Sequence, residues 1–202
     1  LVLQGNSCKG ECSNHMEKLE YLDESHTYLL SGVIIPSVSE LLQFIFPNKY
    51  SNIPTQILKA KASFGTNVHN AIENFENQLP YSLTPMEQIV FEQYLYLKDQ
   101  YNIEAVEQEV MVHYEDKFAG RFDMLANIDG KRSLVDIKTT AKLDHESLAY
   151  QLGFYAMAYG EDFEKYYCIH LPKKDIGRLV EITPKPKEEL LRVIEEYERS
   201  KQ

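Results

Sequence analysis

The sequence predicts an α+β fold in which a central mixed β-sheet is flanked by helices. Apolar residues recur with a helical period in separate segments before and after residues 105–140, and most of that central stretch follows an extended pattern. Its extended segments are joined by short polar turns, which is typical of an antiparallel meander. No internal repeat, low-complexity run or Ser/Gly linker divides the chain.

Length and composition predict one domain. The chain has 202 residues, of which 44% are hydrophobic and 26% charged, as expected for a domain with a single core. Residues 1–15 show no periodicity, and Leu3-Gln4-Gly5 resembles the remnant of a cleaved affinity tag. We therefore interpret residues 1–15 as a tag remnant and residues 16–202 as the domain.

Cysteine content and charge narrow the function classes. After Met16 the only cysteine is Cys168, which argues against disulfides and thiolate metal clusters. No apolar run approaches the roughly 18 residues needed to span a bilayer, so we expect a cytoplasmic protein without membrane contact. The net charge of −10 argues against a general polyanion binder, because lysine and arginine supply most non-specific nucleic-acid affinity. Five lysines are either candidate phosphate contacts or simply part of a solvated surface: Lys59, Lys61, Lys142, Lys173 and Lys174.

The N-terminal third predicts a hairpin followed by a helix. The stretch 20–36 contains two apolar runs around Ser31-Gly32, which is typical of a two-residue hairpin turn. Ser37 and Glu40 have the spacing of a capping box and predict a helix that ends near residue 47.

Two further helices are expected before the meander. Residues 57–76 place apolar side chains on one stripe, with a break near Gly65-Thr66. Thr84 as N-cap and Pro85 at the first helical position start a helix that ends near Tyr101.

The second half alternates strands and helices. The meander is predicted to have strands at 107–114, 118–128 and 133–139. After it we expect a helix from Asp144 to Tyr159, strands at 166–171 and 178–182, and a charged helix at 187–201.

Two carboxylates are predicted to face each other across the meander's second hairpin. If Asp129-Gly130 forms a two-residue type I′ turn, opposed residues have numbers that sum to 259, so Asp123 lies opposite Asp136. Opposed Cβ atoms lie about 4.5–5.5 Å apart, and like charges there are destabilising unless a cation lies between them. Hard oxygen ligands at this separation suit Mg²⁺ or Mn²⁺.

A lysine completes the constellation. Lys138 lies two residues beyond Asp136, so the period of a strand places both side chains on one face. A bound metal and Lys138 could then contact one phosphate, the metal activating water and the ammonium stabilising negative charge in the transition state. The residues therefore predict hydrolysis of a phosphodiester.

These residues also resemble a known family. The segment from Gly120 to Asp123, followed by Asp136-Ile137-Lys138, resembles the core of the PD-(D/E)XK nuclease superfamily, although the initial proline is absent. The resemblance is strongest to the RecB-type and phage-type (lambda-exonuclease-like) exonucleases. Their other motifs are matched by Gly65-Thr66-Asn67-Val68-His69, by Glu109, and by Gln151 and Tyr155.

The resemblance implies a restriction-endonuclease-like core and a role for each motif. It implies that His69, Asp123, Asp136 and the carbonyl of Ile137 bind the metal. It further implies that Glu109 supports the catalytic group of Asp123, Asp136 and Lys138, and that Gln151 and Tyr155 contact DNA or position Lys138. Iron–sulfur members need four cysteines, so we expect no Fe–S cluster here.

The implied function is a Mg²⁺- or Mn²⁺-dependent DNA exonuclease of phage or bacterial recombination or repair. DNA is the expected partner, and some relatives suggest a ring-like homo-oligomer and a single-strand annealing protein. One alternative is a structure-specific endonuclease of the same fold. Another is a non-catalytic DNA-binding or assembly module, whose signature would be a broken Asp…Asp-x-Lys set.

Three residue assignments stay open. Gln151 and Tyr155 either contact DNA or are simply a polar and an aromatic residue on a half-buried helix. Glu107 competes with Glu109 for the role on the preceding strand, because a boundary error of one residue would exchange their faces. Glu73, one helical turn after His69, is either a further acidic ligand or a solvated glutamate.

Overall fold

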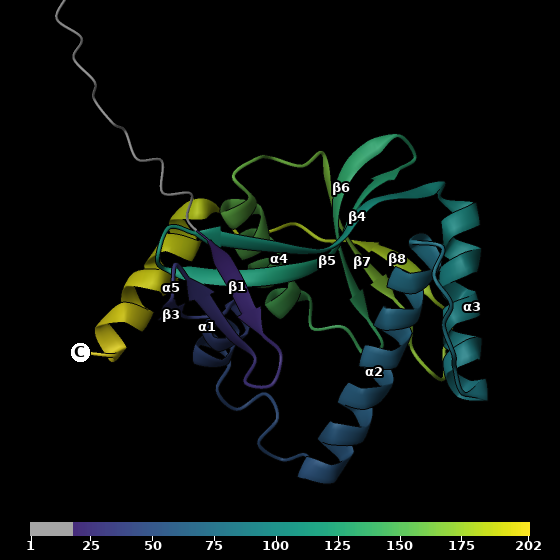
Figure 1. The fold of residues 1–202 in the computed structure, drawn as a ribbon, viewed down its shortest axis with the longest axis horizontal. Coiled ribbons are helices and arrows are strands. Elements are labelled where there is room, and N and C mark those ends of the chain that lie inside the picture. Colours follow the sequence, from purple (N-terminus) through teal and green to yellow (C-terminus); the bar gives the residue numbers. More distant parts are fainter. Residues whose placement is uncertain (1–17) are drawn as a thin grey trace, which may run out of the picture.

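The structure is a computed structural model that describes residues 18–202 and has the α+β fold predicted from the sequence (Figure 1). The interpretation of residues 1–15 as a tag remnant lies outside the described residues. A five-stranded mixed sheet forms the centre, and a smaller three-stranded sheet precedes it in the chain. Helices cover the central sheet, as expected for a restriction-endonuclease-like core.

The central sheet has the strand order β4-β5-β6-β7-β8. Its strands are β4 (Ile103–Tyr114), β5 (Phe118–Ile128), β6 (Lys131–Lys138), β7 (Lys165–His170) and β8 (Arg178–Glu181). Strands β4, β5 and β6 form the predicted antiparallel meander, β7 pairs parallel to β6, and β8 pairs antiparallel to β7.

The β5–β6 hairpin has the predicted register. Asp129 and Gly130 form its turn, with φ of 48° and 75°, as a type I′ turn requires. Residues whose numbers sum to 259 are paired from Ile128↔Lys131 to Met124↔Val135. The described ladder stops at that last pair, one residue before Asp123 and Asp136.

The helices pack against two hydrophobic clusters. One contains residues of α2 (Thr55–Glu76) and α3 (Pro85–Gln100) together with Met124, Val135 and Ile137 of the sheet. The other contains residues of α1 (Val38–Ile45), α4 (His145–Tyr159) and α5 (Lys187–Ser200), together with the sheet residues Phe122, Leu134 and Cys168. The sheet is therefore buried between two helical layers.

Several helix boundaries follow the predicted caps. Ser37 and Thr84 each form a complete capping box at the start of α1 and α3. The side chain of Asp144 accepts a hydrogen bond from the Ser147 amide at the start of α4, and Gly160 ends that helix in the left-handed region. Local hydrogen bonding thus determines these ends.

The N-terminal part contains the predicted hairpin and departs from the prediction in two features. The hairpin around Ser31-Gly32 is β2 (Thr27–Leu30) paired with β3 (Val33–Ile35), and β1 (Leu19–Leu22) pairs with β2 as a third strand that was not predicted. The expected break at Gly65-Thr66 is wrong, since α2 is continuous there. A Cβ atom at Gly65 would lie 3.1 Å from Thr139 Oγ1, so this glycine permits close packing rather than a change of direction.

Candidate active site

Both strands that carry the site are irregular at the same level. Phe122 belongs to the cluster beneath α4, whereas Met124, two residues later, belongs to the cluster beneath α2 and α3. A regular strand would keep both on one face, so β5 changes faces at Asp123. On β4, Glu109 has a φ of 50°, which is unusual for a residue with a side chain. The irregularity brings Glu109 and Asp123 together.

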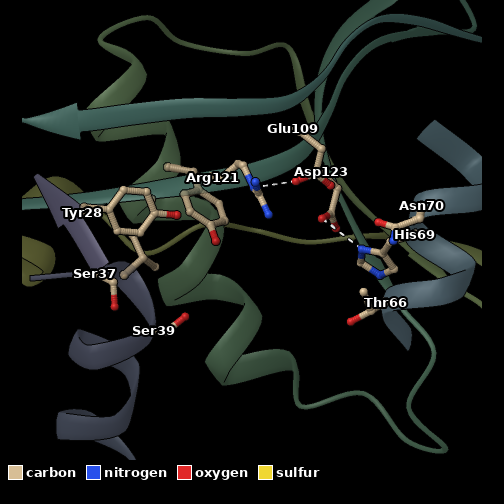
Figure 2. Close-up of a pocket in the computed structure, with 12 residues that line it drawn as sticks. Tyr28, Ser37, Ser39, Thr66, His69, Asn70, Glu109, Arg121 and Asp123 are labelled. Carbon is tan, nitrogen blue, oxygen red and sulfur yellow. Dashed lines mark ion pairs between the residues drawn. The ribbon is translucent and has the colours of Figure 1, made fainter. Parts of the chain in front are cut away.

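An acidic group with one histidine lies at this point (Figure 2). His69 Nδ1 lies 3.2 Å from Asp123 Oδ1, and the amide of Ile137 donates a 2.6 Å hydrogen bond to Asp123 Oδ2. One possible ligand atom from each of His69, Glu109 and Asp123 lies within 4.8 Å of the others. Three separate elements, α2, β4 and β5, therefore converge on one small volume.

Asp136 and Lys138 form the adjoining part of the site. Lys138 Nζ lies 2.8 Å from Asp136 Oδ2 and donates a 3.1 Å hydrogen bond to Oδ1, as their placement on one face predicts. Asp136 is only 3% exposed. Its Oδ2 atom accepts no hydrogen bond of good geometry from any described residue, so at this atom the contact with Lys138 is an ion pair only and lone pairs remain for a further ligand.

Burial and neighbouring charges have opposing effects on the pKa values of Asp136, Asp123 and His69. Burial raises the pKa of Asp136 to about 6, against the attraction of Lys138 and with a further contribution from Asp123. Burial also opposes the charge of Asp123, but His69, Lys138 and the Ile137 amide outweigh it, so the pKa of Asp123 is lowered. For His69, Asp123 outweighs burial and raises the pKa. The two neighbouring carboxyls of Asp123 and Asp136 therefore have pKa values that diverge, a pattern common at catalytic sites.

Glu109 takes the position on β4 that the sequence left open between two glutamates. Burial, followed by the charge of Asp123, raises the pKa of Glu109, and Arg121 Nε lies 2.6 Å from Glu109 Oε2. Glu107 is exposed and lies outside the acidic group. Glu73 is half-buried and contributes only through its charge to the raised pKa of Glu109.

A cavity of about 200 Å³ adjoins the acidic group. Figure 2 shows its two sides, with Thr66, His69 and Asn70 of α2 on one and Tyr28, Ser37 and Ser39 on the other. Arg121 lies between them. Sequence reasoning assigned no function to Arg121, although the strand period would have placed it on the face of Asp123. The remaining lining residues come from segments distant in sequence, which no local pattern could bring together.

Gln151 and Tyr155 lie together on α4. The Gln151 side-chain amide donates a 3.2 Å hydrogen bond to Tyr155 Oη. Tyr155 lines the cavity but is 5% exposed, and burial and the charge of Asp136 raise its pKa. A Cβ atom at Gly120 would lie 2.7 Å from the Tyr155 ring, so the glycine of the Gly-Arg-Phe-Asp motif makes room for this tyrosine.

Comparison with known proteins identifies the family. The model of the PD-(D/E)XK nuclease superfamily matches residues 82–200, more than half of the chain, so the chain belongs to this superfamily of metal-dependent nucleases. A search of curated proteins found no match. Among solved structures, one described as "Crystal structure of SSO0001" is similar over 80% of this chain and 74% of that chain, with 20% sequence identity and a TM-score of 0.47.

The donor set fits a divalent metal ion, which nucleases of this superfamily use. Carboxylate oxygens and one imidazole nitrogen gather within 4.8 Å, and hard cations prefer oxygen ligands. The Oδ2 atom of buried Asp136 accepts no hydrogen bond of good geometry and, beside its ion pair with Lys138, is a further oxygen that a metal ion could bind. None of the helices within residues 18–202 has the length and apolar character to cross a bilayer.

Proposed function

We propose that the chain is a Mg²⁺- or Mn²⁺-dependent DNA exonuclease of the RecB-type and lambda-exonuclease-like branch, formed by a single domain over residues 16–202. The observation that carries the proposal is the convergence of Asp123, Asp136 and Lys138 at the open end of the β5–β6 hairpin, beside His69.

In this proposal the metal ligands are His69, Asp123, Asp136 and the carbonyl of Ile137, and Glu109 supports them from β4. A bound divalent ion would polarise the phosphoryl oxygen and lower the pKa of a water molecule. Lys138, held within 2.8 Å of Asp136, orients the attacking water and stabilises the negative charge of the transition state. Arg121 adds a second cation at the edge of the cavity.

Gln151 and Tyr155 are proposed to position the substrate and Lys138. Tyr155 is almost fully buried, which favours a positioning role, whereas Gln151 is half-buried and is therefore the better candidate for a substrate contact. Kinetics of the Gln151→Ala and Tyr155→Phe variants distinguish the two roles. Loss of a substrate contact raises KM, whereas loss of a contact that positions Lys138 lowers kcat.

The experiment is release of acid-soluble nucleotides from linear duplex and single-stranded DNA with Mg²⁺, Mn²⁺ or EDTA. The wild type is compared with Asp136→Ala and Lys138→Ala. Release that depends on metal and is lost in both variants is expected. No release from any DNA by a folded protein would instead favour the non-catalytic module.

Covalently closed circular DNA separates exonuclease from structure-specific endonuclease. An exonuclease needs an end and leaves the closed circle intact, whereas an endonuclease nicks it. The proposed setting is phage or bacterial recombination or repair, with DNA as substrate, a ring-like homo-oligomer and a single-strand annealing protein as partner. Light scattering that gives a monomer at micromolar concentration would contradict the ring.

A further inference from the structure

The acidic residues are distributed unevenly along the chain. The sequence carries a net charge of −10 but has no aspartate or glutamate from Leu41 to Ile72, from Ile137 to Leu143, or from Lys165 to Lys174. These three stretches contain eight lysines. Lys49, Lys138 and Lys165 form ion pairs, and the other five are Lys59, Lys61, Lys142, Lys173 and Lys174.

The structure brings the three stretches together beside the active site. Thr139 Oγ1 lies 3.1 Å from the position of a Cβ atom at Gly65 of α2. The Leu171 amide donates a 2.8 Å hydrogen bond to the carbonyl of Lys138, so the segment after β7 adjoins the end of β6. Lys173 Nζ lies 3.7 Å from the centroid of the Phe64 ring on α2. The acid-free stretches therefore form one continuous surface.

The outer half of α2, Thr55–Ser63, is the exposed part of this surface. All its side chains are exposed except Leu58, which is half-buried. Figure 1 shows this end of the helix extending away from the body of the molecule. Such a helix segment gains little stability from packing, and its exposure calls for an explanation other than core formation.

Helical periodicity aligns the two lysines of this segment with the site. Lys59 lies two turns before Thr66, on the face that lines the cavity with His69. Lys61 lies one turn before Gly65, on the face directed toward Thr139 and Phe64. At a rise of about 1.5 Å per residue, the helix spans about 15 Å from Lys59 to His69, comparable to roughly four base steps of DNA.

The lysines on this surface are available to an external anion. Within residues 18–202, Lys59, Lys61, Lys142, Lys173 and Lys174 form no ion pair, whereas Lys49, Lys98, Lys117 and Lys165 each pair with a carboxylate. Charge complementarity therefore favours a polyanion that continues from the metal-binding group.

We propose that the outer half of α2 and the loops after β6 and β7 form the track for the DNA backbone adjoining the cleaved bond. We call this surface the α2 track and define it by Lys59, Lys61, Lys142, Lys173 and Lys174. It deepens the proposed nuclease function and rests on it. The track explains how an acidic protein can bind DNA, because aspartate and glutamate are absent from the three sequence stretches that carry its lysines.

The test compares two charge-reversal pairs with a matched control. Lys59→Glu/Lys61→Glu and Lys173→Glu/Lys174→Glu alter the α2 track. Lys131→Glu/Lys187→Glu makes the same change of net charge at two exposed lysines that form no ion pair with a described residue, at the start of β6 and at the start of α5. Binding of a fluorescent single strand and of a duplex is measured by anisotropy over a range of salt concentrations, with Asp136→Asn in every protein to prevent cleavage.

Each track variant is expected to weaken DNA binding about tenfold at low salt. The slope of log K against log salt should become shallower by about 0.7 to 0.9 for every phosphate contact removed. The control pair should bind within about twofold of its parent, since its sites lie off the track. Track variants that match the control pair in affinity and salt slope would overturn the proposal, and the two DNA forms show whether the track prefers one strand or two.

A second readout separates failure of the track from failure of the nuclease. With Asp136 restored, hydrolysis of thymidine 5′-(p-nitrophenyl phosphate), which reaches only the metal-binding group, should be unchanged in the track variants, while their kcat/KM on DNA falls about tenfold. If the track variants lost activity equally on the nucleotide ester and on DNA, the lysines would act on the chemistry itself, and the proposed DNA contact away from the metal-binding group would be overturned. If the wild type cleaves neither substrate, the nuclease proposal fails, and the anisotropy comparison still decides whether the surface binds DNA.

Discussion

The two ends of the β5–β6 hairpin differ sharply. At the turn end, pairing is regular from Ile128↔Lys131 onward, and the Arg132 guanidinium donates a 3.1 Å hydrogen bond to Tyr159 Oη. At the open end, the described ladder stops before Asp123 and Asp136, and the buried Asp136 Oδ2 atom lacks a hydrogen bond. One hairpin thus combines a regular end that sets register with an irregular end that concentrates charge, and stability and activity should be separable along its length.

The largest difference between the ends should be catalytic. Asp136→Asn and Asp123→Asn are expected to lower kcat on DNA by about a thousandfold or more, because each removes a charged group from the proposed site. Asp129→Asn at the turn should retain activity, since asparagine also adopts a positive φ. Steady-state cleavage assays test this contrast. An equally large loss of kcat in Asp129→Asn would contradict it.

The stabilisation of the fold by a bound metal ion should depend on residues at the open end and not on residues at the turn. Mn²⁺ at about 100 times its Kd is expected to stabilise the wild type by about 2.7 kcal/mol. The stabilisation should be lost in His69→Ala and much reduced in Glu109→Gln, which alter the acidic group, and retained in Asp129→Asn. Thermal unfolding with Mn²⁺ or EDTA measures it. Equal stabilisation in all four proteins would place the ion elsewhere.

The open end should make the metal-free protein sensitive to pH. Burial raises the pKa of Asp136 from 3.8 to about 6, so between these values the folded state binds more protons than the unfolded state. The contribution of Asp136 to stability is therefore largest at low pH and falls as pH rises through that window, by about 3 kcal/mol. Urea unfolding in EDTA should show the fall in the wild type, and Asp136→Asn should flatten it. An unchanged slope in the variant would contradict the assignment.

The smallest effect should be purely structural and at the turn end. Gly130 has a φ of 75°, so Gly130→Ala is expected to lower the free energy of unfolding by about 1 kcal/mol through backbone strain. Lys131→Ala provides the control next to it. The urea midpoints of the two variants test this difference in stability, and kcat should stay unchanged in both. A drop in kcat for Gly130→Ala would show that the turn affects the active site, against the proposed separation of the two ends of the hairpin.

The regular features were predictable because their causes are local. Turn chemistry gives the register of Asp129-Gly130, and capping boxes give the starts of α1 and α3. The mixed sheet and the grouping of Asp136 with Lys138 follow from strand period. The functional roles of the eight residues singled out from the sequence remain predictions that the variants above will test.

Other features depend on contacts that are distant in sequence. The pairing of β1 with β2 and the continuity of α2 at Gly65 result from tertiary packing, which overrides local propensity. The positive φ of Glu109 and the change of faces at Asp123 arise where two strands deform together. Arg121 was visible in its motif, but its ion pair with Glu109 required the fold.

Cys168 can serve as a probe of how often the central sheet opens near the active site. Its thiol is fully buried and lies on β7 directly beside Asp136 in the parallel register, and burial raises its pKa. A thiol reagent can reach it only when β6 and β7 separate or the helices above them lift. With Cys8 and Cys12 replaced by serine, the rate of thiol modification would report how often the neighbourhood of Asp136 opens to solvent.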